Sequence, residues 1–175
     1  MRWLLGAVFL VVALVALVFL VGALLPAAHV ASRSAGLSAP PERVWAVMTA
    51  VDDFPRWRPG VRAVEVLDAA GGARRWREHE SAEKRDRGIT YEVIESAPPH
   101  RLVTRIADAG LPFGGRWEYD LAPDGSGTRL TITERGEVYN PLFRFLSRFV
   151  FGHTATMEKY LAALERRLTA SSRSP

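Results

Sequence analysis

The stretch TITERGEVYNPLF, residues 131–143, joins a strand pattern directly to the start of a helix. Its first three residues are β-branched, as is typical of a pleated strand. Counting by two places Leu130, Ile132 and Glu134 on the same face of that strand. Because an unpaired carboxylate is costly in an apolar core, Glu134 is predicted to be paired or to face a cavity.

A long C-terminal helix is predicted to follow this strand. Asn140 is a preferred N-cap residue, and Pro141 suits the first helical position. No proline interrupts the chain from Leu142 to about Leu168. Apolar residues recur in this segment with helical spacing and predict a stripe that packs against a sheet. The stripe consists of Met157, Tyr160 or Leu161, Leu164 and Leu168.

Six strand-like runs, separated by glycine and proline turns, fill the middle of the chain from Val61 to Tyr139. The turns include AAGG, APPH and DGSG, which are typical of strand connections. A short strand, a short helix and one further helical turn are expected before them, over residues 29–57. The pattern favours an antiparallel meander whose apolar face is covered by the long helix, which is an α+β architecture.

An uncharged apolar segment of 23 residues runs from Trp3 to Leu25. As a helix it would extend roughly 34 Å, enough to cross a hydrocarbon core of about 30 Å. The segment therefore predicts an uncleaved, single-pass transmembrane helix. A cleaved signal peptide is the alternative, although the apolar core is longer than the ~7–15 residues typical of one. Arg2 precedes the segment and Arg33 and Arg43 follow it, which leaves the side of the soluble domain open.

Composition and motifs exclude several classes of function. The chain has no cysteine, so disulfides and thiolate chemistry are excluded. The net charge of +4 is spread along the sequence, and no nucleic-acid partner is predicted. The four histidines lack metal-ligand spacing, and no phosphate-binding or dinucleotide fingerprint occurs. Neither a metal nor a cofactor is therefore predicted.

Four stretches carry a resemblance to a known superfamily: PERVWAVMTAVDDFPRWRPGVRAVEV, YEVIESAPPHRLVTRI, GGRWEYDLAPDGSGTRLTITERGEV and NPLFRFLSRFVFG. From about His29 to Leu168 the chain resembles the START-like, polyketide cyclase/dehydrase and lipid-transport superfamily (SRPBCC). The resemblance implies a helix-grip fold, in which a curved antiparallel sheet wraps around a long C-terminal helix and leaves a deep apolar cavity. Members include lipid carriers, quinone binders and cyclases, so the resemblance indicates the fold more sharply than the function.

The predicted transmembrane helix is an addition to the usual member of this superfamily. It divides the chain into a membrane anchor over residues 1–27, a helix-grip domain over 28–170 and a disordered tail over 171–175. The stretch NPLFRFLSRFVFG has two interpretations, because its four phenylalanines cannot share one helical face. Either one aromatic side packs on the sheet while another, flanked by Arg144 and Arg148, contacts a membrane, or all of them are buried.

Candidate cavity residues follow from strand phase within the implied fold. Large aromatic walls with a few polar groups are typical of small-molecule cavities. The predicted lining comprises Trp76, Glu78, Tyr91, Val93, Trp117, Tyr119, Ile132, Glu134, Phe143 and Met157.

The carboxylates of Glu134 and Glu78 have three possible roles. Each is a structural ion-pair partner, an acceptor that orients a ligand, or a general acid or base. For Glu134, Arg105 and Arg135 are the candidate partners, and a structural pair with one of them is the favoured interpretation.

The sequence therefore favours membrane-anchored binding of a hydrophobic small molecule or lipid over catalysis. A polyketide cyclase/dehydratase-like enzyme with an in-cavity carboxylate is the first alternative. An anchored structural or partner-binding domain with a collapsed cavity is the second. The partners expected are the apolar ligand and a membrane, the latter through Trp3 to Leu25.

Overall fold

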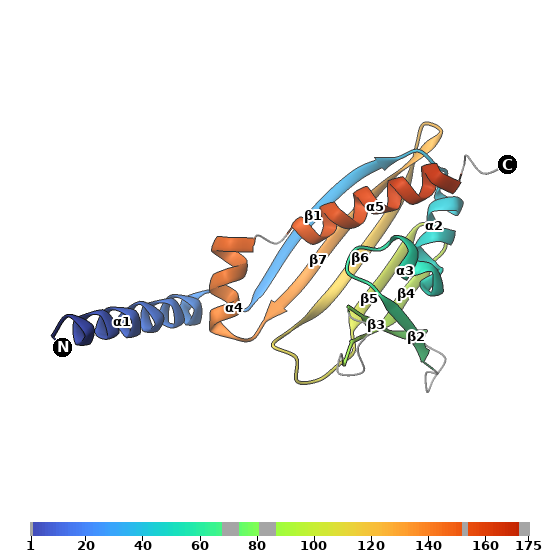
Figure 1. Cartoon of the computed structure of the whole chain (residues 1–175). Helices are drawn as coiled ribbons and strands as arrows, with labels where there is room; N and C mark the ends of the chain where they lie inside the picture. The colour runs from blue at the N-terminus through green and yellow to red at the C-terminus, as the bar shows by residue number, and fades with distance from the viewer. Residues whose placement is uncertain (1, 68–73, 81–86, 152–153, 172–175) are drawn as a thin grey trace.

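The computed structural model describes residues 2–67, 74–80, 87–151 and 154–171. In these residues seven strands form one antiparallel sheet in the order β1-β7-β6-β5-β4-β3-β2 (Figure 1). The strands are β1 (Ala28–Leu37), β2 (Ala63–Leu67), β3 (Arg75–His79), β4 (Ile89–Ala97), β5 (Arg101–Ile106), β6 (Phe113–Asp124) and β7 (Gly127–Val138). The predicted meander and the α+β helix-grip architecture are confirmed.

The helices lie at both ends of the chain and in the connection that follows β1. They are α1 (Arg2–Leu24), α2 (Pro41–Thr49), η1 (Val51–Asp53), α3 (Phe54–Trp57), α4 (Pro141–Leu146), η2 (Ser147–Phe151) and α5 (Ala155–Ser171). The short helix and further helical turn expected before the meander are confirmed as α2, η1 and α3. The tail expected to be disordered lies outside the described residues, except that Ser171 ends α5.

The single helix expected from Leu142 to Leu168 is wrong. The Asn140 cap is present, because its side chain accepts a hydrogen bond from the Leu142 N–H at 2.9 Å. However, α4 ends at Leu146, passes into the π-helical turn η2, and α5 begins at Ala155. α4 lies against α1 whereas α5 packs on the sheet. One straight helix could not bury apolar faces against both partners.

The core lies between α5 and one face of the sheet. Met157, Leu164 and Leu168 on α5 are fully or almost fully buried, as are Leu130 and Ile132 on β7. The predicted helical stripe therefore packs on the predicted strand face. α2 joins the same core beside the C-terminal part of α5.

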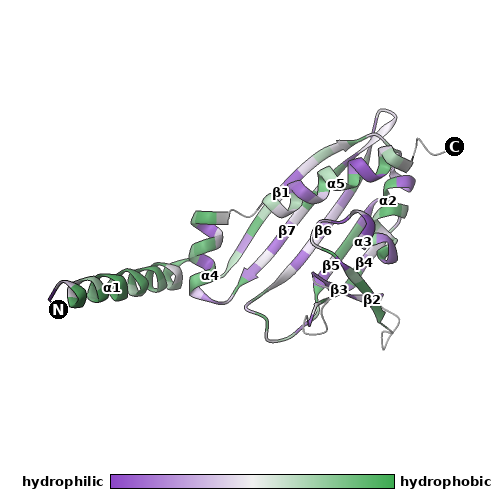
Figure 2. Cartoon of the chain, in the orientation of Figure 1, coloured by the Kyte–Doolittle hydropathy of each residue, from purple (hydrophilic) through white to green (hydrophobic). Residues whose placement is uncertain are grey.

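α1 is hydrophobic on all sides and projects from the domain (Figure 2). It is long and apolar enough to cross a membrane, although a signal sequence has the same properties. Its apolar stretch is not buried by the rest of the chain, which distinguishes α1 from a helix packed into its own domain.

The outer face of the sheet carries a charged cluster centred on Glu118 of β6. Arg116 donates to the Glu118 carboxylate at 2.8 Å and Arg135 at 2.6 Å, while Arg101 lies 3.5 Å from it. The hydrogen bond from Arg116, together with those from Arg135 and Arg101, outweighs the effect of burial. The pKa of Glu118 is lowered from 4.5 to about 2.

We predict that Glu118→Gln destabilises the fold at neutral pH, and that its difference in stability from the natural sequence disappears in acid. Because the folded-state pKa lies below the ordinary value, the charged form stabilises the fold above about pH 4.5, and the contribution disappears as the pH falls toward 2. The expected loss at neutral pH is ~1.5 kcal/mol, since the partner arginines are partly exposed. Thermal melts across this pH range measure it.

The matched control is Glu95→Gln, which removes a half-exposed partner of Arg101. It should cost less than about 1 kcal/mol. A Glu118→Gln variant whose destabilisation persists undiminished at the acid end of the range would contradict this account of the cluster.

Candidate functional site

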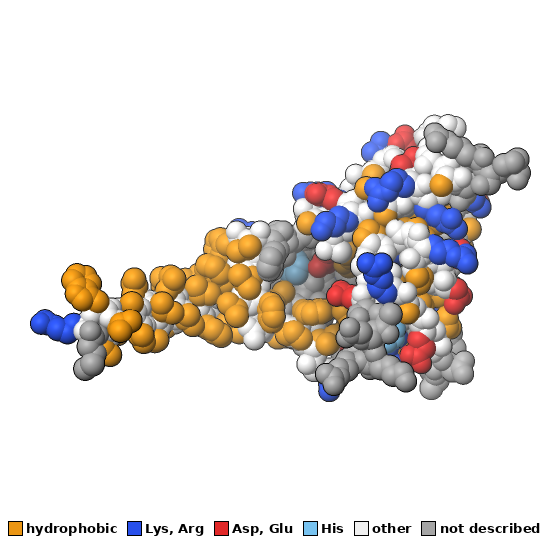
Figure 3. All heavy atoms as spheres, in the orientation of Figure 1, with side chains coloured by type: hydrophobic (Ala, Val, Ile, Leu, Met, Phe, Trp, Pro, Cys, Tyr) orange, Lys and Arg blue, Asp and Glu red, His pale blue; other side chains and the backbone are white. Residues whose placement is uncertain are grey.

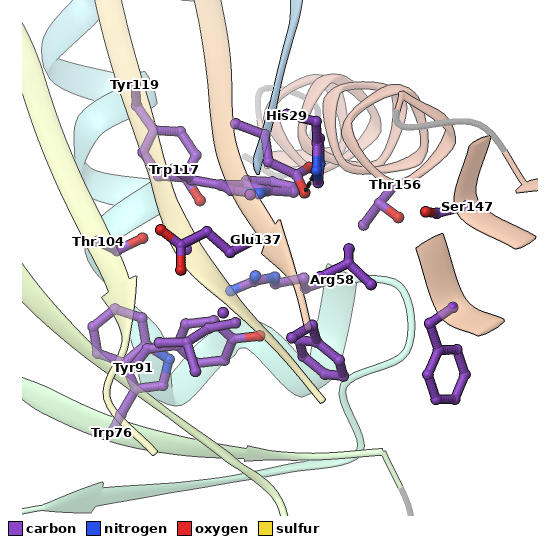
Figure 4. Close-up of a pocket in the computed structure, with 18 residues that line it drawn as sticks. His29, Arg58, Trp76, Tyr91, Thr104, Trp117, Tyr119, Glu137, Ser147 and Thr156 are labelled. Carbon is purple, nitrogen blue, oxygen red and sulfur yellow. Dashed lines mark hydrogen bonds and ion pairs between the residues drawn. The ribbon is translucent and has the colours of Figure 1, made fainter. Parts of the chain in front are cut away.

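A cavity of about 410 Å³ lies between the sheet and the start of α5, at the end of the sheet nearest α4. Its size is within the range of small-molecule sites. Figure 4 shows tryptophan and tyrosine residues on one side of the cavity, Thr156 and Ser147 on the other, and Arg58 between them. The lining includes His29, Arg58, Trp76, Tyr91, Thr104, Ile106, Phe113, Trp117, Tyr119, Glu134, Phe143, Ser147 and Thr156.

Strand register brings the aromatic wall together. Trp76 on β3 is paired with Tyr91 on β4, and their rings stack with centroids 5.8 Å apart. Trp117 and Tyr119 are two residues apart on β6 and therefore point to the same face, with ring centroids 5.9 Å apart. Tyr160 of α5 contacts both of these rings. The wall is therefore fixed by backbone pairing and by edge-to-face packing between large rings.

The Arg58 side chain introduces a positive charge into this aromatic surrounding. Its Nη1 donates to Glu78 Oε1 at 2.5 Å, and Trp76 Nε1 donates to the same oxygen at 2.8 Å. The guanidinium carbon lies 5.0 to 5.8 Å from the ring centroids of Phe54, Tyr91 and Tyr160. Both partners of the pair are almost fully enclosed, with side-chain exposures of 14% and 9%.

Burial opposes the charge of Arg58, but attraction to Glu78 and to the neighbouring tyrosine oxygens outweighs it. The pKa of Arg58 is therefore raised above its ordinary value, and the side chain stays charged. Burial also raises the pKa of Tyr119 to about 12 and raises the pKa values of Tyr91 and Tyr160. Their hydroxyl groups remain protonated at neutral pH and can donate hydrogen bonds.

Glu134 is paired with His29 and not with an arginine. His29 Nε2 lies 3.3 Å from Glu134 Oε1, and about a fifth of each side chain is exposed. Both expected partners were wrong, because strand alternation turns them to the outer face. There Arg135 donates to Glu118 and Arg105 donates to Glu92.

Two glycines that face each other on β6 and β7 shape the cavity near His29. Gly115 on β6 has φ +130°, and a Cβ there would lie 2.4 Å from the Arg135 carbonyl oxygen. A Cβ on Gly136 would lie 2.3 Å from the His29 ring. The first glycine permits the close approach of β6 and β7, and the second leaves room for the imidazole.

The structure places the residues predicted from sequence in three locations. Those that line the cavity are Trp76, Tyr91, Trp117, Tyr119, Glu134 and Phe143. Glu78 lies behind Arg58 and faces an adjoining pocket of about 340 Å³. Three residues lie elsewhere: Ile132 and Met157 are fully buried in the core, and Val93 packs partly buried against the core and borders a separate pocket with Trp45. Strand and helix phase alone did not separate the cavity wall from solid core.

Sequence reasoning missed Arg58, His29, Thr104 and Thr156. The phase of β1 could have found His29, because counting by two places it on the same face as Ala31, Ala35 and Leu37. Arg58 follows the end of α3 in an irregular connection, where no periodic pattern indicates the direction of a side chain. No group of three or more potential metal ligands occurs among the described residues.

Comparison with known proteins identifies the fold independently. A family model described as polyketide cyclase / dehydrase and lipid transport matches residues 28–169, which begin just after α1. The chain is similar to the Zhui aromatase/cyclase from Streptomyces sp. R1128, with a TM-score of 0.67, 16% identity, and coverage of 84% of this chain and 97% of that one. No curated protein sequence matches the chain.

Two further solved structures have the same fold. A START superfamily protein from Mycobacterium smegmatis gives a TM-score of 0.64 at 18% identity, covering 82% of this chain and 99% of that one. A protein from Thermus thermophilus gives 0.63 at 25% identity, covering 83% and 99%.

We predict that Glu78→Gln destabilises the domain by ~3–5 kcal/mol. Glutamine keeps the shape and can still accept the Trp76 hydrogen bond, but it leaves the buried Arg58 charge without a counter-charge. Chemical denaturation measures the loss. The control is Glu65→Gln, which removes an exposed partner of Arg77 at 3.3 Å and should cost less than about 1 kcal/mol. Equal stability of the two variants would show that the Arg58 charge does not depend on Glu78.

Proposed function

The chain belongs to the polyketide cyclase/dehydrase and lipid transport family, and on that basis we propose that it binds a hydrophobic small molecule or lipid between the sheet and α5. The observation that carries this proposal is the aromatic-walled cavity of about 410 Å³. A domain with a collapsed cavity would not have this space. Burial of an apolar ligand against these rings would supply the main driving force.

The polar groups of the cavity indicate which ligands fit. Arg58 donates one N–H to Glu78, and a guanidinium has five N–H donors. Protonated tyrosine hydroxyls lie beside it. These groups are suited to an oxygen acceptor, such as a carbonyl or hydroxyl group, at one end of an otherwise apolar ligand. Isoprenoids, quinones, lipids and polyketide-like aromatics all fit this description.

We further propose that α1 remains uncleaved and holds the domain at a membrane as a single-pass anchor. The support is its length of 23 residues and the exposure of its apolar side chains. About 20 apolar residues are enough to span a bilayer.

A cyclase- or dehydratase-like activity is the second candidate, and the His29–Glu134 pair favours it. An imidazole and a carboxylate 3.3 Å apart on the cavity wall have the arrangement that general acid–base catalysis uses. In a binding protein the same pair would only orient the polar end of the ligand.

Glu134→Gln tests the role of this pair. Because both side chains are partly exposed, we expect a change in stability of less than about 1 kcal/mol, in contrast to Glu78→Gln. Melting curves with and without bound ligand measure it. A large loss of stability in the empty domain would instead assign Glu134 a structural role. Lost conversion of an aromatic polyketide substrate with unchanged substrate affinity would favour the enzyme.

Thr156→Trp should block the cavity and weaken ligand binding. Thr156 is exposed and lines the cavity, so a large side chain there can obstruct it without disrupting the core. We expect the Kd for the fluorescent dye anilinonaphthalene sulfonate to rise about tenfold, which corresponds to ~1.4 kcal/mol. Fluorescence titration of the detergent-solubilised full chain measures it.

Ala155→Trp is the matched control, because Ala155 is the adjacent exposed residue and does not line the cavity. It should bind the dye as the natural sequence does. Equal dye affinity for both tryptophan variants would argue that the dye binds outside the cavity.

A further inference from the structure

α1 is packed firmly on α4. Gly22 is the buried residue of α1, and a Cβ at this position would lie 2.0 Å from the Pro141 carbonyl oxygen. By contrast, a Cβ on Gly6, near the other end of α1, would have no neighbour within 4 Å. Only residues 25–27 connect α1 to β1. The contact at Gly22 and the short connection together fix the direction of α1 relative to the sheet.

Arg144 of α4 strengthens the junction between α1 and α4 through hydrogen bonds to backbone carbonyls. Its Nε donates to the Val138 carbonyl at 2.6 Å, its Nη1 to the Leu25 carbonyl at 3.3 Å and its Nη2 to the Tyr139 carbonyl at 3.1 Å. One guanidinium therefore joins the chain just after α1, the end of β7 and α4. The sequence pattern predicts Arg144 beside a membrane contact, and in the structure its guanidinium group binds three backbone carbonyls of the protein.

The end of the domain beside α1 exposes an apolar surface, here called the basal surface. Phe149 is 59% exposed and Val150 is 61% exposed, so burial of the whole aromatic stretch is wrong. In Figure 3 the hydrophobic surface of α1 continues onto the adjoining end of the domain. The basal surface comprises Phe113, Tyr139, Phe143, Phe149 and Val150.

The cavity lies directly behind the basal surface. Phe113 and Phe143 belong to the basal surface and also line the cavity. Val138 and Ser147, which lie next to it in the chain, line the cavity as well. The side chains that border this end of the cavity are thus continuous with the exposed apolar patch.

We infer that the basal surface lies in the interfacial layer of the bilayer that α1 spans, so that the cavity receives a membrane-resident lipid directly from that bilayer. We assign the basal surface to the bilayer and not to another protein because it continues the apolar surface of α1. The contacts of Gly22 with Pro141 and of Arg144 with Leu25 hold α1 against this end of the domain. An exposed apolar patch of this kind marks a contact surface, and aromatic side chains are favoured at membrane interfaces. The inference rests on the proposed function and specifies the source of the ligand.

The absence of cysteine allows a direct test with the full chain. Single-cysteine variants Phe149→Cys and Ser126→Cys are labelled with an environment-sensitive fluorophore and reconstituted into phosphatidylcholine vesicles, which are then washed with alkaline carbonate. Ser126 lies in the β6–β7 turn, at the opposite end of β7 from α4. Phosphatidylcholine carrying a nitroxide near the headgroup should quench the label at position 149 strongly and the label at position 126 hardly at all.

Absence of nitroxide quenching at position 149 would overturn the inference. This includes the case in which the label is shielded from an aqueous quencher by a second copy of the chain or by another protein. Dye binding in the cavity is measured separately on the same samples. Lost dye binding with retained quenching would contradict the proposed function. Retained dye binding without quenching would contradict only the placement of the basal surface in the bilayer.

A pair of glycine variants tests the junction. Gly22→Val introduces a side chain into the contact with Pro141, whereas Gly6→Val meets open space. Gly22→Val should remove most of the quenching at position 149 while the melting temperature of the domain is retained. Gly6→Val should leave the quenching unchanged. Equal quenching in the two variants would show that the junction does not position the basal surface.

Discussion

The architecture depends on how far one amphipathic helix can cover the apolar face of the sheet. The buried stripe on α5 begins at Met157 and ends at Leu168, and most of it packs on the apolar face of the sheet, although Tyr160 within it also borders the pocket beside Glu78. The residues before α5, in α4 and η2, do not cover the sheet. Instead, α4 packs against α1. The sheet continues past the start of α5, and the uncovered part becomes the cavity. The break in the helix thus creates both the binding space and the contact with the anchor.

The charge of Arg58 imposes a second constraint on this space. A buried ion pair adds little net stability, because desolvation of both groups offsets their attraction, but removal of one partner is costly. The Arg58–Glu78 pair, held by Trp76 and surrounded by aromatic rings, therefore contributes more to the chemistry of the cavity than to its stability. It gives an otherwise apolar cavity one fixed point at which a polar atom of the ligand can be recognised.

Strand alternation and helix capping depend on neighbouring residues alone, and the features that they determine could be predicted from the sequence. Strand alternation placed Trp117 and Tyr119 on the inner face, and the cap at Asn140 marked the start of α4. The end of α4 and the partner of Glu134 depend on tertiary contacts that no local pattern encodes. Arg58 was missed for the same reason, since it enters the cavity from an irregular connection. Ile132 has the inward phase expected of a wall residue, yet α5 covers it completely.

Native mass spectrometry of the full chain released from detergent micelles can show whether the cavity holds a ligand, because it detects a bound molecule by its mass whatever its identity. We expect a population of chains that each carry one non-covalently bound apolar molecule, which dissociates when the complex is activated. Identification of the released molecule would then define the ligand. Folded chains that are found only at their own mass, in preparations that retain membrane lipid, would contradict the claim that the cavity is a binding site.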